Sequence, residues 1–306
     1  MRVVFMGTPD ISATCLRRLV QEKFDVVGVY TKPDMPKNRG MKLVMSETKL
    51  CALDAGIPVF QPATFRDDAV VDELRALRPD VIAVVAYGKI LPQRVLDIPR
   101  LGCINIHASV LPELRGSGPV QWAILNGMTE TGVTAMYMSA GMDEGDIIEI
   151  RKTPIEPFEN AQSLLDRLAV IGAELLCDTL RAAETGTACR TPQDGTKATY
   201  APMLTKALCP IDWTQSMRRI TDHVRGLDPW PVATAELAGK KFKIYSVRPT
   251  EKKTDLAPGT PVVLTKLALE VACGDGVLEI LELQAEGGKR MAAADYLRGH
   301  PVQVDV

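Results

Sequence analysis

The first half of the chain alternates short apolar runs with amphipathic helical patterns, and this alternation constrains its fold more than any other feature. Residues 80–86, Asp-Val-Ile-Ala-Val-Val-Ala, are apolar nearly throughout, as is typical of a parallel strand covered on both faces. The alternation predicts an α/β fold in which helices cover both faces of a doubly wound, mostly parallel sheet. The other predicted strands are 2–6, 24–30, 58–60, 102–107 and 133–137, and the predicted helices are 11–22, 46–55, 67–77, 120–126 and 161–183.

The pattern changes after residue 184. Residues 184–205 carry two prolines and two glycines among small polar residues without sustained periodicity, and we interpret this stretch as a linker, placed at 189–205. A helix is expected at 214–225, and the rest reads as short strands separated by turn residues. Short strands in a segment of this size favour a small barrel of the oligonucleotide-binding type, although a β-sandwich fits nearly as well. The predicted strands are 234–237, 241–247, 261–264, 267–272 and 277–283.

Composition and charge exclude several classes of protein. With 46% hydrophobic and 24% charged residues the chain has globular values, which exclude a fully disordered protein. A formal net charge of −2 excludes a protein that coats nucleic acid by bulk charge, so any such binding must use local patches. No apolar run approaches the ~18–20 residues that span a bilayer, and the chain opens on a strand without a signal-peptide pattern. We expect a cytoplasmic protein without membrane contact.

The cysteines and histidines offer no metal-site spacing. The seven cysteines are scattered and never form a Cys-x-x-Cys pair, and there are only three histidines. The cysteines are therefore interpreted as reduced core residues, and no metal is expected.

The carboxyl ends of the predicted strands are where a ligand should bind. The turn at residues 7–9 lacks the spacing of a dinucleotide fingerprint, and no phosphate loop is present, which disfavours a nicotinamide or nucleotide enzyme. Asn105 and His107 end the strand 102–107 and, being two residues apart, share one face. An amide and an imidazole supply two hydrogen-bond donors, one of which can also move a proton. A buried histidine held by a backbone carbonyl is the alternative reading of His107.

A proton-moving imidazole needs a carboxylate to orient it and stabilise its charged form. The best supplier is residues 141–146, Gly-Met-Asp-Glu-Gly-Asp, directly after the strand 133–137. Spacing alone cannot choose between Asp143 and Asp146. A solvated turn or a loose cation site is the alternative for these acids.

Two clusters of basic residues are candidates for contact with nucleic acid. Lys37, Arg39 and Lys42 crowd the loop 32–42, which is otherwise read as a mobile solvated loop. A second cluster could track a nucleic-acid backbone or simply protect a strand edge from aggregation. It contains Lys240, Lys241, Lys243, Arg248, Lys252 and Lys253.

Together these motifs resemble the formyltransferase family that uses 10-formyltetrahydrofolate. The resemblance rests on Asn-x-His at 105–107, Ser-Val-Leu-Pro-x-x-Arg-Gly-x-x-Pro at 109–119 and Met-Asp-x-Gly-Asp at 142–146. Val-Val-Phe-Met-Gly-Thr-Pro at 3–9 and Val-Ala-Tyr-Gly-Lys-Ile-Leu-Pro at 85–92 fit the same family. Val110 stands where the family usually has leucine, and Asp10-Ile11 where an aromatic residue is commoner; neither change touches a proposed catalytic group.

The resemblance implies a division of the chain and a set of site residues. It implies a Rossmann-like formyltransferase domain at 1–188, the linker 189–205 and an OB-like tRNA-binding domain at 206–306. It chooses Asp143 over Asp146, which makes the catalytic trio Asn105, His107 and Asp143. The turn 86–92 and the loop around Gly141 would wall the pterin pocket. The residues implied to contact tetrahydrofolate are Ser109, Val110, Leu111 and Pro112.

The full-length layout is similar to that of family members that formylate the α-amine of a methionyl initiator tRNA, which is used to start translation. The resemblance implies 10-formyltetrahydrofolate as the formyl donor, no metal and a monomer. It also implies that Arg39 enters the acceptor arm of the tRNA. The further residues expected to contact the RNA are Lys37, Lys42, Lys240, Lys241 and Lys243.

Other functions stay open at this point. A relative that formylates an amino-sugar nucleotide or glycinamide ribotide, or a formyl-folate hydrolase, would keep the trio without the basic segments. A non-catalytic RNA-binding protein would tolerate loss of His107.

Overall fold

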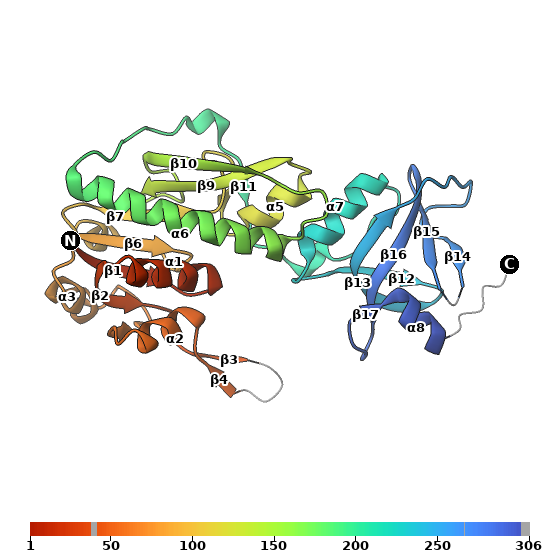
Figure 1. Ribbon diagram of the computed structural model, residues 1–306, viewed down its shortest axis with the longest axis horizontal. Coiled ribbons are helices and arrows are strands. Elements are labelled where there is room, and N and C mark those ends of the chain that lie inside the picture. The colour runs from red at the N-terminus through yellow and green to blue at the C-terminus, as the bar shows by residue number, and fades with distance from the viewer. Residues whose placement is uncertain (38–41, 266, 301–306) are drawn as a thin grey trace. The chain divides into compact units, whose positions relative to one another are not determined.

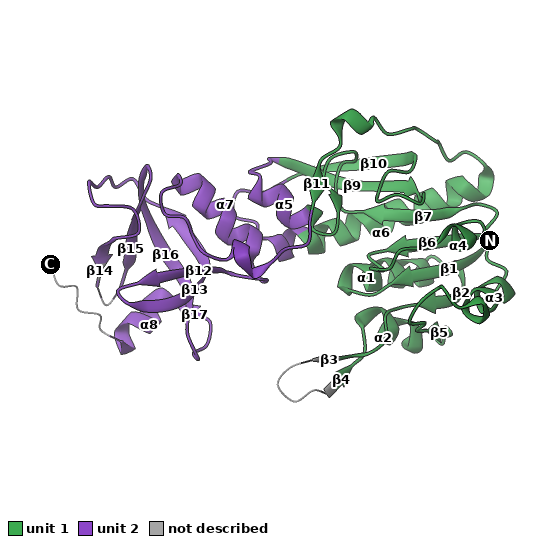
Figure 2. Ribbon diagram, turned by 180° about the vertical axis from the view of Figure 1, so that it is seen from behind, with its two compact units in different colours: residues 1–119, 130–154, 165–201 green, residues 120–129, 155–164, 202–306 purple. Residues whose placement is uncertain are grey.

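A computed structural model describes residues 1–37, 42–265 and 267–300 of the chain. They divide into two compact units drawn from interleaved segments (Figure 2). The first unit consists of residues 1–119, 130–154 and 165–201, and the second of residues 120–129, 155–164 and those from 202 onward. The boundaries 1–188, 189–205 and 206–306 stay a prediction, and residues 189–201 of the predicted linker lie in the first unit.

The first unit contains a seven-stranded sheet in the order β10-β9-β7-β6-β1-β2-β5 (Figure 1). Five neighbouring strands, from β5 to β7, run parallel. β9 pairs antiparallel with β7, and β10 antiparallel with β9. The strands are β1 (Arg2–Gly7), β2 (Asp25–Tyr30), β5 (Val59–Phe60), β6 (Val81–Val85), β7 (Cys103–His107), β9 (Glu130–Tyr137) and β10 (Ile147–Pro154).

Helices lie on both faces of this sheet (Figure 1). On one face, Val4 and Ile82 join a buried apolar cluster with Leu74 of α3 and Val95 of α4. On the other face α6 comes so close to the sheet that a Cβ on Gly172 would lie 3.1 Å from the Ile106 side chain. The doubly wound α/β fold predicted from the sequence is confirmed. The helices are α1 (Asp10–Gln21), α2 (Glu47–Asp54), α3 (Asp68–Ala76), α4 (Gln93–Leu96) and α6 (Ala161–Thr185).

Two predicted helix starts follow from capping residues. The Ser46 hydroxyl accepts the backbone N–H of Lys49 at the start of α2, and the Asp67 carboxylate accepts that of Ala69 at the start of α3. Each cap supplies a partner for a backbone donor that the first helical turn leaves without one. Local chemistry thus fixes these two helix starts.

Several elements escape the sequence patterns because they are short or lie at an edge. β10 borders only β9 and mixes half-buried with exposed residues, so no strong alternation marks it. The others are the hairpin β3 (Met35–Lys37) and β4 (Lys42–Val44), the pair β8 (Arg115–Gly116) and β11 (Tyr200–Ala201), α4, the 3-10 turns η1 (Gly195–Lys197) and η2 (Lys206–Leu208), and β17 (Met291–Ala292) with α8 (Ala293–Gly299).

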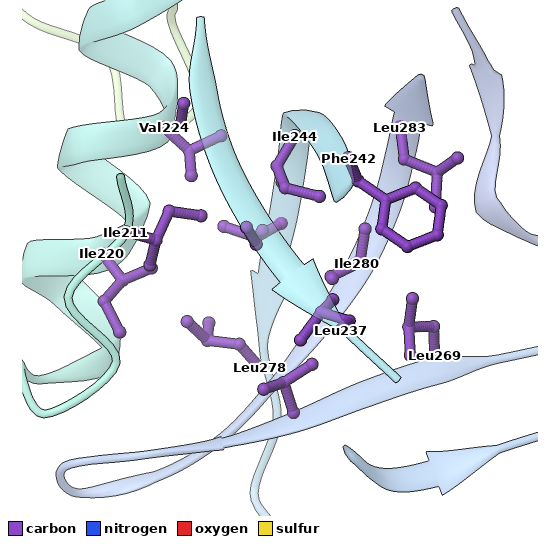
Figure 3. Close-up of a cluster of buried hydrophobic side chains, with 14 of the residues drawn as sticks. Ile211, Ile220, Val224, Leu237, Phe242, Ile244, Leu269, Leu278, Ile280 and Leu283 are labelled. Atoms are coloured by element: carbon purple, nitrogen blue, oxygen red, sulfur yellow. The ribbon is translucent and has the colours of Figure 1, made fainter. Parts of the chain in front are cut away.

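The second unit is an antiparallel sheet in the order β12-β13-β16-β15-β14, with β17 paired to β16 (Figure 1). Ile220 and Val224 of α7 pack against its inner face with Ile244 and Leu278 (Figure 3). Within the described residues no ladder joins β14 to β12, so the predicted barrel is an open half-barrel. The elements are α5 (Pro119–Leu125), α7 (Met217–Leu227), β12 (Ala233–Leu237), β13 (Lys240–Pro249), β14 (Pro261–Leu264), β15 (Leu269–Cys273), β16 (Gly276–Ala285), β17 (Met291–Ala292) and α8 (Ala293–Gly299).

Candidate active site

Asn105 and His107 lie at the carboxyl end of β7, the strand at which the parallel part of the sheet meets antiparallel β9. Side chains alternate along a strand, so both share the face opposite to Ile106. Asn105 is 8% and His107 6% exposed. The Asn105 amide makes no side-chain hydrogen bond within the described residues, so its N–H groups are available to a ligand. The strand therefore presents an unused amide and a buried imidazole side by side.

One nitrogen of His107 is held by the backbone. Its Nε2 lies 3.0 Å from the carbonyl oxygen of Leu114, a geometry in which the Nε2–H donates. Leu114 has a positive φ of 58°, and its N–H donates to the Thr199 hydroxyl at 2.8 Å. The alternative interpretation of His107, a buried histidine held by a backbone carbonyl, therefore applies to Nε2 only. In the neutral ring this leaves the lone pair of Nδ1 to accept a proton.

The second nitrogen of His107 faces Asp143. Nδ1 lies 3.7 Å from Asp143 Oδ2, and the same oxygen accepts the Gly116 N–H at 2.8 Å. Asp146 points elsewhere, with its Oδ2 3.8 Å from Arg190 Nη1. The structure therefore brings His107 together with Asp143, not with Asp146.

The loop that carries Asp143 is tightly held. A Cβ on Gly145 would lie 1.8 Å from the carbonyl oxygen of Tyr137, so the backbone passes too close for any side chain. Asp143 itself has a positive φ of 52°, in the left-handed region that few residues other than glycine adopt. Such a conformation persists only where the surroundings hold it.

A residue that sequence reasoning missed completes this support. The Gln193 amide donates to the carbonyl oxygens of Asp143 and Gly145 at 2.9 and 2.8 Å, and its oxygen accepts from Arg115. Gln193 lies in the predicted linker, where no periodicity marks it. The strand pair β8–β11 brings that segment alongside Arg115. The one sequence signal that leads toward Gln193 is indirect: the Arg-Gly motif at 115–116 places its partner Arg115 near the site.

The residues assigned to tetrahydrofolate contact divide into two kinds. Ser109 is 1% exposed and its hydroxyl donates to the Glu113 carbonyl, while Leu111 is also buried. Val110 and Pro112 are half-exposed and retain surface to offer a ligand. Contact of these four residues with the folate stays a prediction, and the Ser109 hydroxyl is already used inside the turn.

The turn after β6 lies at the neighbouring strand end and was predicted to wall the same pocket. Ala86 and Gly88 both have positive φ, at 45° and 71°. The Thr8 hydroxyl, which follows β1, donates to the carbonyl oxygen of Tyr87 at 3.3 Å. The ends of β1 and β6 are thus joined, and the backbone turns sharply beside the Asn105 strand.

Comparison with known proteins decides the family. Residues 1–180 match the model of the formyl transferase family, and residues 203–301 match that of the formyl transferase C-terminal domain. The chain belongs to the formyl transferase family. It is 48% identical over 299 residues to the methionyl-tRNA formyltransferase of Geobacter metallireducens, covering 98% of this chain and 96% of that one. The resemblance read from the motifs is confirmed, and the chain is a formyl-transferring enzyme.

Solved structures share the fold at low identity. An N-formyltransferase from Helicobacter canadensis, in complex with folinic acid and dTDP-3-aminofucose, has a TM-score of 0.70 at 18% identity, covering 91% of this chain and 98% of that one. HypX from Aquifex aeolicus, in complex with tetrahydrofolic acid, has a TM-score of 0.65 at 20% identity, covering 97% of this chain and 47% of that one.

The basic residues predicted to contact RNA are described in part. Arg39 lies outside the described residues, and of Lys37 and Lys42 only the strand backbone is described. Lys240, Lys241 and Lys243 are exposed. The last two line a cleft of about 610 Å³ in the second unit, with Trp213 and Thr234 on its wall. None of the three lysines forms an ion pair within the described part of the chain.

Neighbouring cations of this formyltransferase are used within the protein. Arg248 pairs with Glu279, and Lys252 lies 2.7 Å from Glu270 Oε2. These carboxylates balance the charges of Arg248 and Lys252, whereas the three lysines at the start of β13 have no such partner in the described residues.

All seven cysteines are free, and burial raises the pKa of the Cys15 and Cys103 thiols to about 12. In residues 1–37, 42–265 and 267–300 no three His, Cys, Asp or Glu side chains gather as a metal site would require. No helix of the same residues is long and apolar enough to cross a bilayer.

Proposed function

We propose that this chain transfers the formyl group of 10-formyltetrahydrofolate to the α-amino group of methionyl initiator tRNA, giving N-formylmethionyl-tRNA for translation initiation. The observation that carries the acceptor is the 48% identity with a methionyl-tRNA formyltransferase across both family segments. The solved relatives that share the fold are complexes with tetrahydrofolic acid and with folinic acid, which supports a folate as the formyl donor.

Asn105, at the end of β7, offers hydrogen-bond donors that suit the formyl group of a folate. When an amine attacks the formyl carbon, negative charge develops on the formyl oxygen, and preorganised N–H donors stabilise it. The Asn105 amide has both N–H groups free of other partners in the described structure. Asn105 is therefore proposed to hold the formyl oxygen.

His107 is proposed to move the proton. The attacking amine must lose a proton, and N10 must gain one when its bond to the formyl carbon breaks. Nε2–H donates to the Leu114 carbonyl, so Nδ1 is the nitrogen that can accept and return this proton. The Asp143 carboxylate, 3.7 Å away, stabilises the imidazolium that forms. A positioned acid–base group of this kind contributes about 10²–10⁴ in rate.

RNA binding is assigned to the exposed lysines at the start of β13. Lys241 and Lys243, which have no ion-pair partner in the described structure, are proposed to contact the tRNA backbone together with Lys240. The roles of Arg39, Lys37 and Lys42, the monomeric state and the cytoplasmic location stay predictions.

The direct test is formation of the product. The protein is incubated with 10-formyltetrahydrofolate and either methionyl initiator tRNA or methionyl elongator tRNA, and formylmethionine is measured after deacylation. We expect formylation of the initiator species. Parallel reactions with a dTDP-amino sugar and with glycinamide ribotide test the other acceptors, and formylation of either in place of the tRNA would contradict the proposal.

A further inference from the structure

The side chain of Gln193 connects the loop that carries Asp143 to the motif that carries Arg115. The proposed proton transfer depends on the position of that loop. Its Nε2 donates to the carbonyl oxygens of Asp143 and Gly145, on either side of Glu144. Its Oε1 accepts from Nε and Nη2 of Arg115, at 3.2 and 2.8 Å. One amide therefore spans the loop that carries Asp143 and the motif that carries Arg115.

Arg115 fixes the direction of that amide. Its guanidinium is buried at 6% exposure, and no carboxylate within the described residues forms an ion pair with it. A guanidinium only donates, so the Gln193 oxygen must face it and the NH2 group must face the two carbonyls. A hydrogen bond to a charged donor is also stronger than a neutral one. Arg115 thus holds Gln193 in the one orientation that binds the Asp143 loop.

Asp143 is held from two sides by neighbouring residues. The Gly116 N–H fixes the carboxylate directly, and Arg115 fixes the backbone of Asp143 through Gln193. The backbone of Asp143 is left-handed, at φ 52°, a conformation that the surroundings must stabilise. Loss of the Gln193 donors would free two carbonyls and let the loop relax.

We propose that Gln193 is a positioning residue for formyl transfer, which holds Asp143 at the distance from His107 that the proton transfer requires. This inference rests on the proposed function. It predicts an effect on turnover rather than on substrate binding, because Gln193 acts through the backbone of Asp143.

Two variants separate the two sides of the amide. Gln193→Glu keeps an oxygen for Arg115 but sets a second oxygen against the carbonyls of Asp143 and Gly145, whereas Gln193→Ala removes the hydrogen bonds on both sides. A displacement of about 1 Å at a reacting group can cost roughly hundredfold. We expect both variants to lower kcat about tenfold or more, with KM for tRNA and folate within about twofold. Matched changes at Gln21, which is exposed on α1, should leave kcat unchanged.

A double-mutant cycle shows whether Gln193 works through Asp143. Added to Asp143→Asn, the Gln193→Ala change should cost less than about twofold, because the carboxylate that it positions is already absent. An equal loss of kcat with and without Asp143, a wild-type kcat in Gln193→Glu, or a loss that matches the unfolded fraction would overturn the inference.

Hydrogen exchange gives a readout that does not depend on the acceptor. Gln193→Glu should speed amide exchange in residues 139–146 while the core strands β1 and β6 exchange as in the wild type. Unchanged amide exchange in residues 139–146 would show that Gln193 does not hold the Asp143 loop, and this result would count even if no acceptor were formylated. Absence of transfer by the wild type, with faster exchange in the variant, would instead count against the proposed function alone.

Discussion

His107 Nδ1 lies 3.7 Å from Asp143 Oδ2, while its Nε2 is bound to the Leu114 carbonyl. This arrangement assigns a separate partner to each ring nitrogen. His107→Ala should lower kcat for formyl transfer at least about a hundredfold, because the variant has no proton carrier at this position. Steady-state kinetics with methionyl initiator tRNA and a thermal unfolding scan give the two readouts. A folded variant with near-normal turnover would remove His107 from the mechanism.

Asn105→Ala tests the donor for the formyl oxygen. Removal of one preorganised donor typically costs about 2.7–4 kcal/mol, or 10²–10³ in kcat. Asn105 makes no side-chain hydrogen bond within the described residues, so its removal leaves no protein partner unsatisfied and should change stability little. A fall in kcat with an unchanged unfolding midpoint is the expected result. Equal losses of activity and folded protein would instead indicate a packing role.

Gly145→Ala tests how closely the Asp143 loop is fitted. The added Cβ would lie 1.8 Å from the backbone oxygen of Tyr137, so the loop must move. We expect a loss of about 1–3 kcal/mol in the free energy of unfolding and at least about a tenfold fall in kcat.

Gly195→Ala is the matched control for that change. A Cβ on Gly195, in the turn η1 of the same unit, would have no heavy atom within 4 Å apart from its chain neighbours. Its effects should therefore be much smaller, and equal effects of the two variants would show that close passage at Tyr137 is not what restricts the Asp143 loop.

The joint change Lys241→Ala and Lys243→Ala tests the RNA surface. Removing a lysine that binds a phosphate should reduce the salt dependence of binding by about one in the log–log slope. We expect a higher KM for tRNA at physiological salt, a shallower slope and an unchanged KM for folate. Lys252→Ala is the control because Lys252 already pairs with Glu270. Identical salt slopes in the double variant and the wild type would place the tRNA elsewhere.

The sequence was sufficient for those features that depend on local periodicity or on neighbouring residues. The β-branched run at 80–86 had to be buried on both faces, and it became β6, whose five residues are all buried. Asn105 and His107 share a face because they are two residues apart on one strand. Ser46 and Asp67 mark helix starts because caps act within one turn.

Features formed by distant segments could not be read in the same way. Gln193 meets Arg115 across 78 positions, through a two-residue strand pair that has no periodicity. The Ser109 hydroxyl is used inside its own turn, which a motif cannot show. The choice of Asp143 over Asp146 came from family resemblance, and a fold was needed to show which carboxylate faces the imidazole.

His223 of the second unit makes a prediction about pH. Burial lowers the pKa of His223 below 6.5, with a smaller lowering by Arg219 and an opposing hydrogen bond to the Cys209 backbone. Its Nε2 has no partner in the described structure. The unfolded chain therefore binds a proton at a pH where the folded chain does not, so stability falls as pH drops below about 6.5. In the first unit, hydrogen bonds from Lys49 and Gln61 lower the pKa of Asp34, and those from the Arg2 backbone and Arg100 lower the pKa of Asp80. Both carboxylates therefore stay ionised in this range.

Tryptophan fluorescence can follow this unit alone, because all three tryptophans (Trp122, Trp213 and Trp230) lie in it. Urea unfolding is measured between about pH 7.5 and 5, on either side of the ordinary histidine pKa. His223→Leu should lose less stability over this range than the wild type, whereas His300→Gln, at an exposed position, should show the wild-type fall. If His223→Leu and the wild type fell in parallel, protonation of His223 would not be the cause of the acid sensitivity.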